Sequence, residues 1–375
     1  MSELPTTAEE RAERLSAMLS GTRAQTRAGR RMQMNRPGNL LFGVLLHAAA
    51  RLDRGLPLTD LEQRLVDTAG KYLPAGELPG LGRVYGEACA RGPIAVLPRV
   101  ITDLPLEKGF GSADLTAALP ALAEEITAQP NVRIVDVSRL AEGESIDTDE
   151  DIAAMADYGR GITILTAPPQ DASLTGPITV RVRMHKFHVV EESAGEVGAD
   201  EIYWGLGAGS DTTAKKSFDT REYGSIHTGE VHHFDYVYGK ETYLFNGTVD
   251  KHMSAEIQCW EADNSPDSFY QKLRDALADF ADHAADTSSE ISQAYDNEAR
   301  KAAAWAALLS LGAGLLNALL GLFVNDDDLV HERSFGWTRD YLISMSRMPN
   351  GENYFHFNGG DGGYHKLYLR LNDLG

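Results

Sequence analysis

The chain has 375 residues, of which 43% are hydrophobic and 24% are charged, and its formal net charge is −20. This length allows two or three domains with separate cores, whereas the acidic balance argues against nucleic acid as a partner and favours cations or basic surfaces. The two cysteines, Cys89 and Cys259, lie far apart, which excludes a disulfide framework and a cysteine zinc motif and fits a reducing compartment.

The first 36 residues form a basic segment. A helix is predicted to begin after Thr7, and the remainder reads as a flexible arm, used either for docking or as a solvated tail. The start lacks the apolar core of a signal sequence, so we expect a cytoplasmic protein, with export by a non-classical route left open. Seven arginines give the segment its charge: Arg11, Arg14, Arg23, Arg27, Arg30, Arg31 and Arg36.

Residues 37–170 are predicted to form a mostly helical domain with a small α/β tail. Apolar residues at 39–52 indicate a buried helix. Thr59 and Glu62 have the spacing of a capping box, which indicates the start of the next helix. Gly- and Pro-rich stretches then interrupt the pattern until a helix at about 112–129. The strand-like "VRIVDV" and "ITILTA" flank a further short helix, and no familiar active-site motif occurs in this part.

From 177 to 375 the hydrophobic period changes to two residues. In "ITVRVRM", Val180, Val182 and Met184 alternate with polar side chains, as expected for a strand with one buried face. Seven or eight such runs predict an antiparallel β-sandwich. The predicted fold class is therefore α+β, with a helical N-terminal domain followed by a sandwich.

A helical insert at 268–325 interrupts the sandwich pattern. Its last part, 302–324, has no charged residue and is long enough to cross a bilayer. Gly312 and Gly314 are the expected break points of a helical hairpin. The insert is either packed inside the protein or released for insertion at a membrane. The side chains expected to meet a membrane or partner are Trp305, Leu308, Leu315, Leu316, Leu319, Leu320 and Phe323.

Acidic loops follow several of the predicted strands. "EESAGEVGADEIY" and "CWEADNSPDSF" each place carboxylates next to an aromatic strand, and "NDDDL" returns the chain from the insert. Loops at one end of a sandwich converge, and Ca²⁺ takes six to eight oxygen ligands from such loops. Like charges this close together are unfavourable unless water or a cation offsets them. The alternative is a set of solvated turns.

These two loops resemble the first and third calcium loops of C2 domains, which are calcium-dependent phospholipid-binding sandwiches. The resemblance covers about residues 177–375 and implies a C2-like topology. The chain differs in having Glu at the first acid of each loop, Glu201 in place of a proline, and the long insert. The resemblance implies the ligands Glu192, Asp200, Glu261, Asp263 and Asp267, to which the returning segment adds Asp326 and Asp328.

Two histidine groups, "HKFH" and "HTGEVHH", are candidate zinc ligands. In a strand, residues three or five apart face opposite sides, so neither His185 with His188 nor His227 with His232 converges. We therefore expect ordinary surface or core histidines.

The predicted function is calcium-assisted binding to an anionic phospholipid membrane or a protein partner. The Ala-, Arg- and Gly-rich composition fits a bacterial protein, and the expected role is that of an effector-like or toxin-like protein. One alternative is an enzyme whose active site lies in the N-terminal domain, with the sandwich as a targeting module. Another is a structural or cargo component of a larger assembly, docked through residues 8–36.

Overall fold

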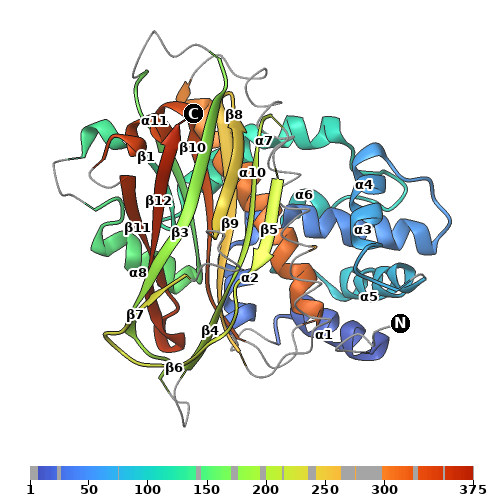
Figure 1. Cartoon of the computed structure of the whole chain (residues 1–375). Helices are drawn as coiled ribbons and strands as arrows, with labels where there is room; N and C mark the ends of the chain where they lie inside the picture. Colours follow the sequence, from blue (N-terminus) through green and yellow to red (C-terminus); the bar gives the residue numbers. More distant parts are fainter. Residues whose placement is uncertain are drawn as a thin grey trace. The chain divides into compact units, whose positions relative to one another are not determined.

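A computed structural model describes most of the chain (Figure 1). The described residues are 7–22, 27–74, 76–140, 145–169, 176–194, 200–212, 215–234, 242–262, 275, 298–323, 328–348 and 351–374. The chain divides into two compact units, which we call the helical unit and the sheet unit. The helical unit comprises Met1–Ile126, Pro266–Lys272 and Ser310–Asn325, and the sheet unit comprises Thr127–Ser265, Leu273–Leu309 and Asp326–Gly375.

The helical unit begins as the sequence predicts and then departs from it. Thr7 caps helix α1 with a capping box, and Thr59 and Glu62 do the same for α4, so both predicted helix starts are confirmed. The segment expected to be a flexible arm contains helix α2. The helices are α1 (Ala8–Ser20), α2 (Arg27–Met34), η1 (Arg36–Asn39), α3 (Leu40–Asp53), α4 (Asp60–Ala69), α5 (Glu77–Arg91), α6 (Arg99–Thr102) and α7 (Ser112–Thr127).

Helix α5 forms in a stretch whose Gly and Pro content suggested a loop. Pro79 lies in the first turn, where a missing N–H costs little. Gly82 lets α5 approach α3 closely, because a Cβ there would lie 2.3 Å from the carbonyl carbon of Ala49. The glycine that weakens the helix signal in the sequence is thus required by the packing.

The sheet unit contains two sheets that face each other, consistent with a β-sandwich (Figure 1). The larger sheet has the order β1-β2-β10-β9-β4-β5, with β6 beside β4. The smaller has the order β11-β12-β3-β7, with β8 beside β3. The strands are β1 (Val132–Asp136), β2 (Arg160–Thr166), β3 (Ile178–Glu191), β4 (Asp200–Ser210), β5 (Lys215–Asp219), β6 (Tyr223–Ile226), β7 (Val231–His233), β8 (Tyr243–Val249), β9 (His252–Glu261), β10 (Asp328–Thr338), β11 (Glu352–Asn358) and β12 (Tyr364–Leu374).

The larger sheet is mixed. The sequence pattern predicted an antiparallel sandwich for 177–375 and placed the two strands before it in a small α/β tail, whereas these two strands pair within the same sheet. β1 pairs with β2 in parallel, and β2 pairs in parallel with β10. The connection from β1 to β2 carries helix α8 (Asp149–Tyr158), the usual device for joining parallel strands. These two strands therefore extend the sheet that the later strands build.

The core of the sheet unit lies between the two sheets. Alternation in β3 works as predicted, with Val180, Val182 and Met184 fully buried. Aromatic contacts join the sheets: the rings of Trp204 and Phe357 are 5.0 Å apart. The short helix α11 (Arg339–Ser346) follows β10 and adds further buried side chains.

Helix α10 (Glu298–Phe323) is a single helix, so the predicted break at Gly312 and Gly314 is wrong. Instead, Gly314 permits a close backbone contact, because a Cβ there would lie 2.1 Å from the carbonyl oxygen of Gly38. Among the described helices, α10 is the one that is long and apolar enough to cross a membrane, with mean hydropathy 1.9. In this structure, 78% of its most apolar stretch is buried inside the protein. A helix buried in a protein core can have the same length and composition.

Candidate cation site

Three of the predicted acidic segments meet at one end of the larger sheet. β4 begins at Asp200, β9 ends at Glu261 and β10 begins at Asp328. The pairing sets Glu261 opposite Ile202 on one side and opposite Asp328 on the other. Asp200 lies two residues before Ile202 and so shares its face. Three segments that are distant in sequence therefore end on three neighbouring strands, with β9 between β4 and β10 and the side chains of Asp200 and Glu261 on one face.

Asp200 is buried and holds the end of β3 against β4. Its two carboxylate oxygens accept hydrogen bonds from the backbone N–H and the hydroxyl of Ser193, both at 2.7 Å. A carboxylate has about four lone-pair directions. Asp200 is thus fixed in orientation by the loop residue next to Glu192 and retains acceptor capacity for a cation.

Glu192 holds the turn between β6 and β7. Its oxygens contact the His227 ring at 3.0 Å and the N–H of Thr228 at 2.9 Å. These contacts, the N–H of Thr228 first, hold the pKa of Glu192 below its ordinary value. The carboxylate is therefore ionised, and its described contacts secure a neighbouring turn.

The remaining predicted ligands are partly outside the described residues. Asp263, Asp267 and Asp326 lie there, and Asp328 is described by its backbone. Glu261 is buried at the end of its strand. Within the described ranges, His, Cys, Asp and Glu side chains form no group of three or more arranged to hold a metal ion.

The histidines considered for zinc contact carboxylates of the surface turns and strands. His227 faces Glu192, His232 lies 3.0 Å from Glu230, and His185 pairs with Glu352. Each of these contacts joins two strands or closes a turn. They have the geometry of hydrogen bonds between histidine rings and carboxylates.

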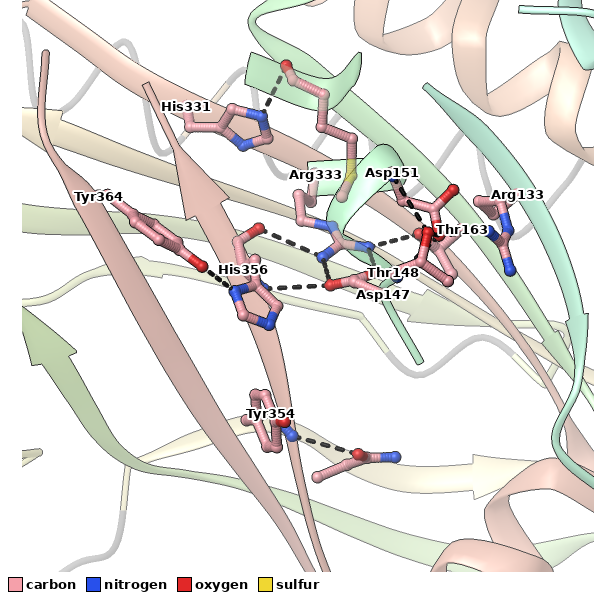
Figure 2. A network of polar contacts seen from close by, with 12 residues as sticks. Arg133, Asp147, Thr148, Asp151, Thr163, His331, Arg333, Tyr354, His356 and Tyr364 are labelled. Carbon is pink, nitrogen blue, oxygen red and sulfur yellow. Dashed lines mark hydrogen bonds and ion pairs between the residues drawn. The ribbon is translucent and has the colours of Figure 1, made fainter. Parts of the chain in front are cut away.

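A buried ion pair that sequence reasoning missed connects the two sheets (Figure 2). The Arg333 guanidinium donates to both oxygens of Asp147, at 2.6 and 3.0 Å, and to the Thr163 hydroxyl at 2.6 Å. It also donates to the carbonyl of His356, whose N–H donates to Asp147. Burial acts to raise the pKa of Asp147, but the charge and hydrogen bonds of Arg333 outweigh it and lower the pKa. Both charges are therefore retained and matched.

A second buried cluster lies on the opposite face of β10. Ser334 donates to Glu256 at 2.6 Å, and Glu332 lies 3.2 Å from Arg160. Gln258 donates to Glu332 at 3.4 Å. Burial, reinforced by the charge of Glu332, raises the pKa of Glu256 well above its ordinary value. Two buried acids thus lie near one arginine, and the folded structure favours the protonated form of Glu256.

The N-terminal half of α10 packs beside this second cluster. Trp305 donates from its ring nitrogen to the hydroxyl of Ser254 at 3.1 Å. Its ring rests against Gly336, where a Cβ would lie 2.8 Å away. Trp305, Leu308, Leu316, Leu319, Leu320 and Phe323 are buried, and Leu315 is half-buried. The predicted membrane or partner residues are therefore largely enclosed in this structure.

The helical unit contains one fully buried charged cluster. Glu62 contacts His47 and Arg51, both at 3.2 Å, and accepts from the N–H of Phe110 at 3.1 Å. Burial acts to raise the pKa of Glu62, but His47 and the N–H groups of Thr59 and Phe110 hold it below its ordinary value. The cluster joins α3, α4 and the segment before α7, and its side chains are closed off from solvent.

Comparison with protein-family models and with curated protein sequences gives no match.

Proposed function

We propose that the chain binds Ca²⁺ at the end of the larger sheet and uses the ion to attach to an anionic membrane surface. The observation that carries the proposal is the strand register, in which Asp200, Glu261 and Asp328 end neighbouring strands. Concentrated carboxylates repel one another, and a divalent cation offsets that repulsion. Oxygen donors of this kind suit a hard cation rather than zinc.

The donor set fits Ca²⁺ better than Mg²⁺. Ca²⁺ accepts six to eight oxygens in flexible geometry, whereas Mg²⁺ requires a near-ideal octahedron. Asp200 is oriented by Ser193 and has lone pairs to spare. The sequence neighbours Asp263, Asp267 and Asp326 would add oxygens to those of Glu261 and Asp328. This arrangement of acids at one end of a two-sheet fold is the reason for proposing a C2-like sandwich.

The ion would supply charge neutralisation and a bridge to phosphate oxygens of lipid headgroups. The membrane step would then involve α10, whose apolar length matches a bilayer core. In the soluble form α10 is held by packing and by the Trp305–Ser254 hydrogen bond. Release of this helix at a membrane would give an effector-like or toxin-like protein its conditional insertion.

Calorimetry tests the ion site. The variant Asp200→Asn/Glu261→Gln removes two charges at the site, and we expect its Ca²⁺ affinity to fall at least tenfold, about 1.4 kcal/mol. Glu124→Gln/Glu125→Gln makes the same charge change on the exposed side of α7 and should bind like the wild type. Equal affinities for both variants, or no heat from the wild type, would exclude the site.

Sedimentation with vesicles containing phosphatidylserine tests the membrane step. The wild type should pellet with Ca²⁺ and remain soluble with chelator, whereas vesicles of neutral lipid should not recruit it. Pelleting that is unaffected by chelator would separate membrane binding from the ion site and contradict the proposal.

A further inference from the structure

The outer face of the smaller sheet has a composition unlike the rest of the sheet unit. Along β12, Leu367, Leu369 and Leu371 are buried, while the residues between them are half-exposed. The strand register then sets tyrosine and cationic side chains in rows across β11, β12 and β3. We call this surface the cationic face; it comprises Arg181, Arg183, Lys186, His188, Glu352, Tyr354, Lys366, Tyr368 and Arg370.

Its charge is opposite to that of the surrounding chain. Among the described side chains it holds five lysines and arginines against Glu352 within it and Glu191 at its end, and the register places the backbone of Asp373 opposite Arg181. Residues 101–375 together carry a net charge of −24. A face of this sign in an acidic unit favours an anionic partner and orients it, because the rest of the surface repels such a partner.

The cations are held among aromatic rings. The Lys186 ammonium lies 4.6 Å from the centre of the Tyr368 ring, and the Lys366 ammonium lies 5.6 Å from that of Tyr354. The two tyrosine rings are 5.4 Å apart. Lys366 takes part in none of the ion pairs formed by the described residues, so its ring contact leaves the ammonium able to meet an anion. Figure 2 shows Tyr354 on β11, close to the ring of His356.

Glu352, at one edge of the cationic face, contacts two of its cations. Arg370 lies 3.2 Å from one of its oxygens and Lys186 lies 4.0 Å from the other. One carboxylate thus serves two cations and also pairs with His185. Among the described side chains, the single carboxylate of Glu352 therefore faces both Lys186 and Arg370.

We propose that the cationic face binds a linear anionic polysaccharide, whose carboxylate or sulfate groups pair with Lys186, Lys366 and Arg370. An extended chain that lies along β12 meets Lys366, Tyr368 and Arg370 in turn, at the spacing of alternate strand residues. Tyrosine hydroxyls add hydrogen bonds to sugar oxygens, and tyrosine rings offer apolar area beside a polar tip. This binding is separate from the proposed calcium site and needs neither the ion nor α10.

Two other polyanions fit the same face less well. Single-stranded nucleic acid binds by stacking bases on free aromatic faces, and here lysine ammonium groups occupy a face of Tyr354 and of Tyr368. A flat bilayer needs protruding cations, whereas the side chains of Lys186 and Arg370 are 28% and 29% exposed. A single flexible chain reaches such recessed groups.

The test uses the full chain with chelator present, so that failure of the calcium site cannot affect the result. Immobilised heparin and hyaluronate are the probes, the first carrying sulfates and carboxylates and the second carboxylates only. We expect the wild type to bind at least one of them and to elute at moderate salt. Lys186→Gln/Lys366→Gln should weaken the affinity at least tenfold and make the salt dependence less steep.

Lys71→Gln/Lys108→Gln is the matched control, because it makes the same charge change at exposed positions of the helical unit. It should bind as the wild type does, and far-ultraviolet circular dichroism should show both variants folded. The proposal is overturned if neither polysaccharide binds, or if the two variants lose affinity equally. Tighter binding to poly(dT), poly-L-glutamate or phosphatidylserine vesicles than to either polysaccharide would assign the face to a different partner.

Discussion

Two buried charge clusters lie on opposite faces of β10, and they are balanced differently. On the inner face, Arg333 meets one carboxylate, that of Asp147, with two hydrogen bonds. On the outer face, Glu332 and Glu256 share a single arginine, Arg160. A buried charge is tolerated when it is paired and hydrogen-bonded. The matched pair therefore favours both charged forms, whereas the unmatched cluster favours the protonated form of Glu256.

Breaking the matched pair should have the largest effect. In Asp147→Asn the Arg333 guanidinium stays buried without its counter-charge, and we expect the free energy of unfolding to fall by about 3–5 kcal/mol. Urea titration followed by circular dichroism measures it. Glu150→Gln, at an exposed position of α8, serves as control and should change stability by less than about 0.5 kcal/mol.

Replacing both members of the pair sharpens the same comparison. Asp147→Leu/Arg333→Met leaves no unpaired charge and should be more stable than Asp147→Asn. A double variant as unstable as the single one would mean that packing, rather than unpaired charge, dominates at this position.

The unmatched cluster should show itself in the pH dependence of stability. The pKa of Glu256 is raised above the ordinary 4.5 in the folded protein, so above that pH the folded state binds a proton that the unfolded state releases. Stability should therefore fall as pH rises from 4.5 toward the raised pKa, by up to about 1.4 kcal/mol per pH unit. Glu256→Gln carries no titrating group and should flatten this decline in urea titrations at pH 5 to 8. Parallel curves for the two proteins would contradict the assignment.

A solvated ion pair completes the series and should have the smallest effect. Arg83 lies 2.9 Å from Asp53 in the helical unit, with the arginine side chain 64% exposed. Asp53→Asn should cost less than about 1 kcal/mol, because water screens exposed pairs. Thermal unfolding in low and high salt measures the loss, which should shrink as salt is added. A loss comparable to that of Asp147→Asn would remove burial as the cause of the difference.

Local signals in the sequence predicted the parts of the fold that local physics determines. The capping box of Thr59 and Glu62 is a contact across three residues, and the alternation of β3 reflects one buried face. The alternating pattern before Trp260 likewise predicted a strand that leads into an acidic segment, and β9 ends at Glu261. Only the register, however, sets Asp328 directly opposite Glu261.

Contacts between distant residues were beyond the reach of this reasoning. Asp147 and Arg333 are separated by 186 residues, and nothing near Asp147 indicates its partner. Alternation along β10 puts Arg333 between His331 and Phe335 on one buried face. A charged residue at a core position was therefore the one indication in the sequence that Arg333 has a buried partner. The parallel pairing of β2 with β10 is equally non-local.

His356 gives the Arg333–Asp147 pair a consequence beyond stability. β11 is the last strand of its sheet among those described, and the outward N–H and C=O of His356 are occupied by Asp147 and Arg333. An open strand edge recruits further strands from other molecules and seeds fibrillar aggregates. A side-chain ion pair that fills these backbone positions leaves neither group of His356 open to a further strand, so we expect it to hinder such recruitment at the middle of the edge.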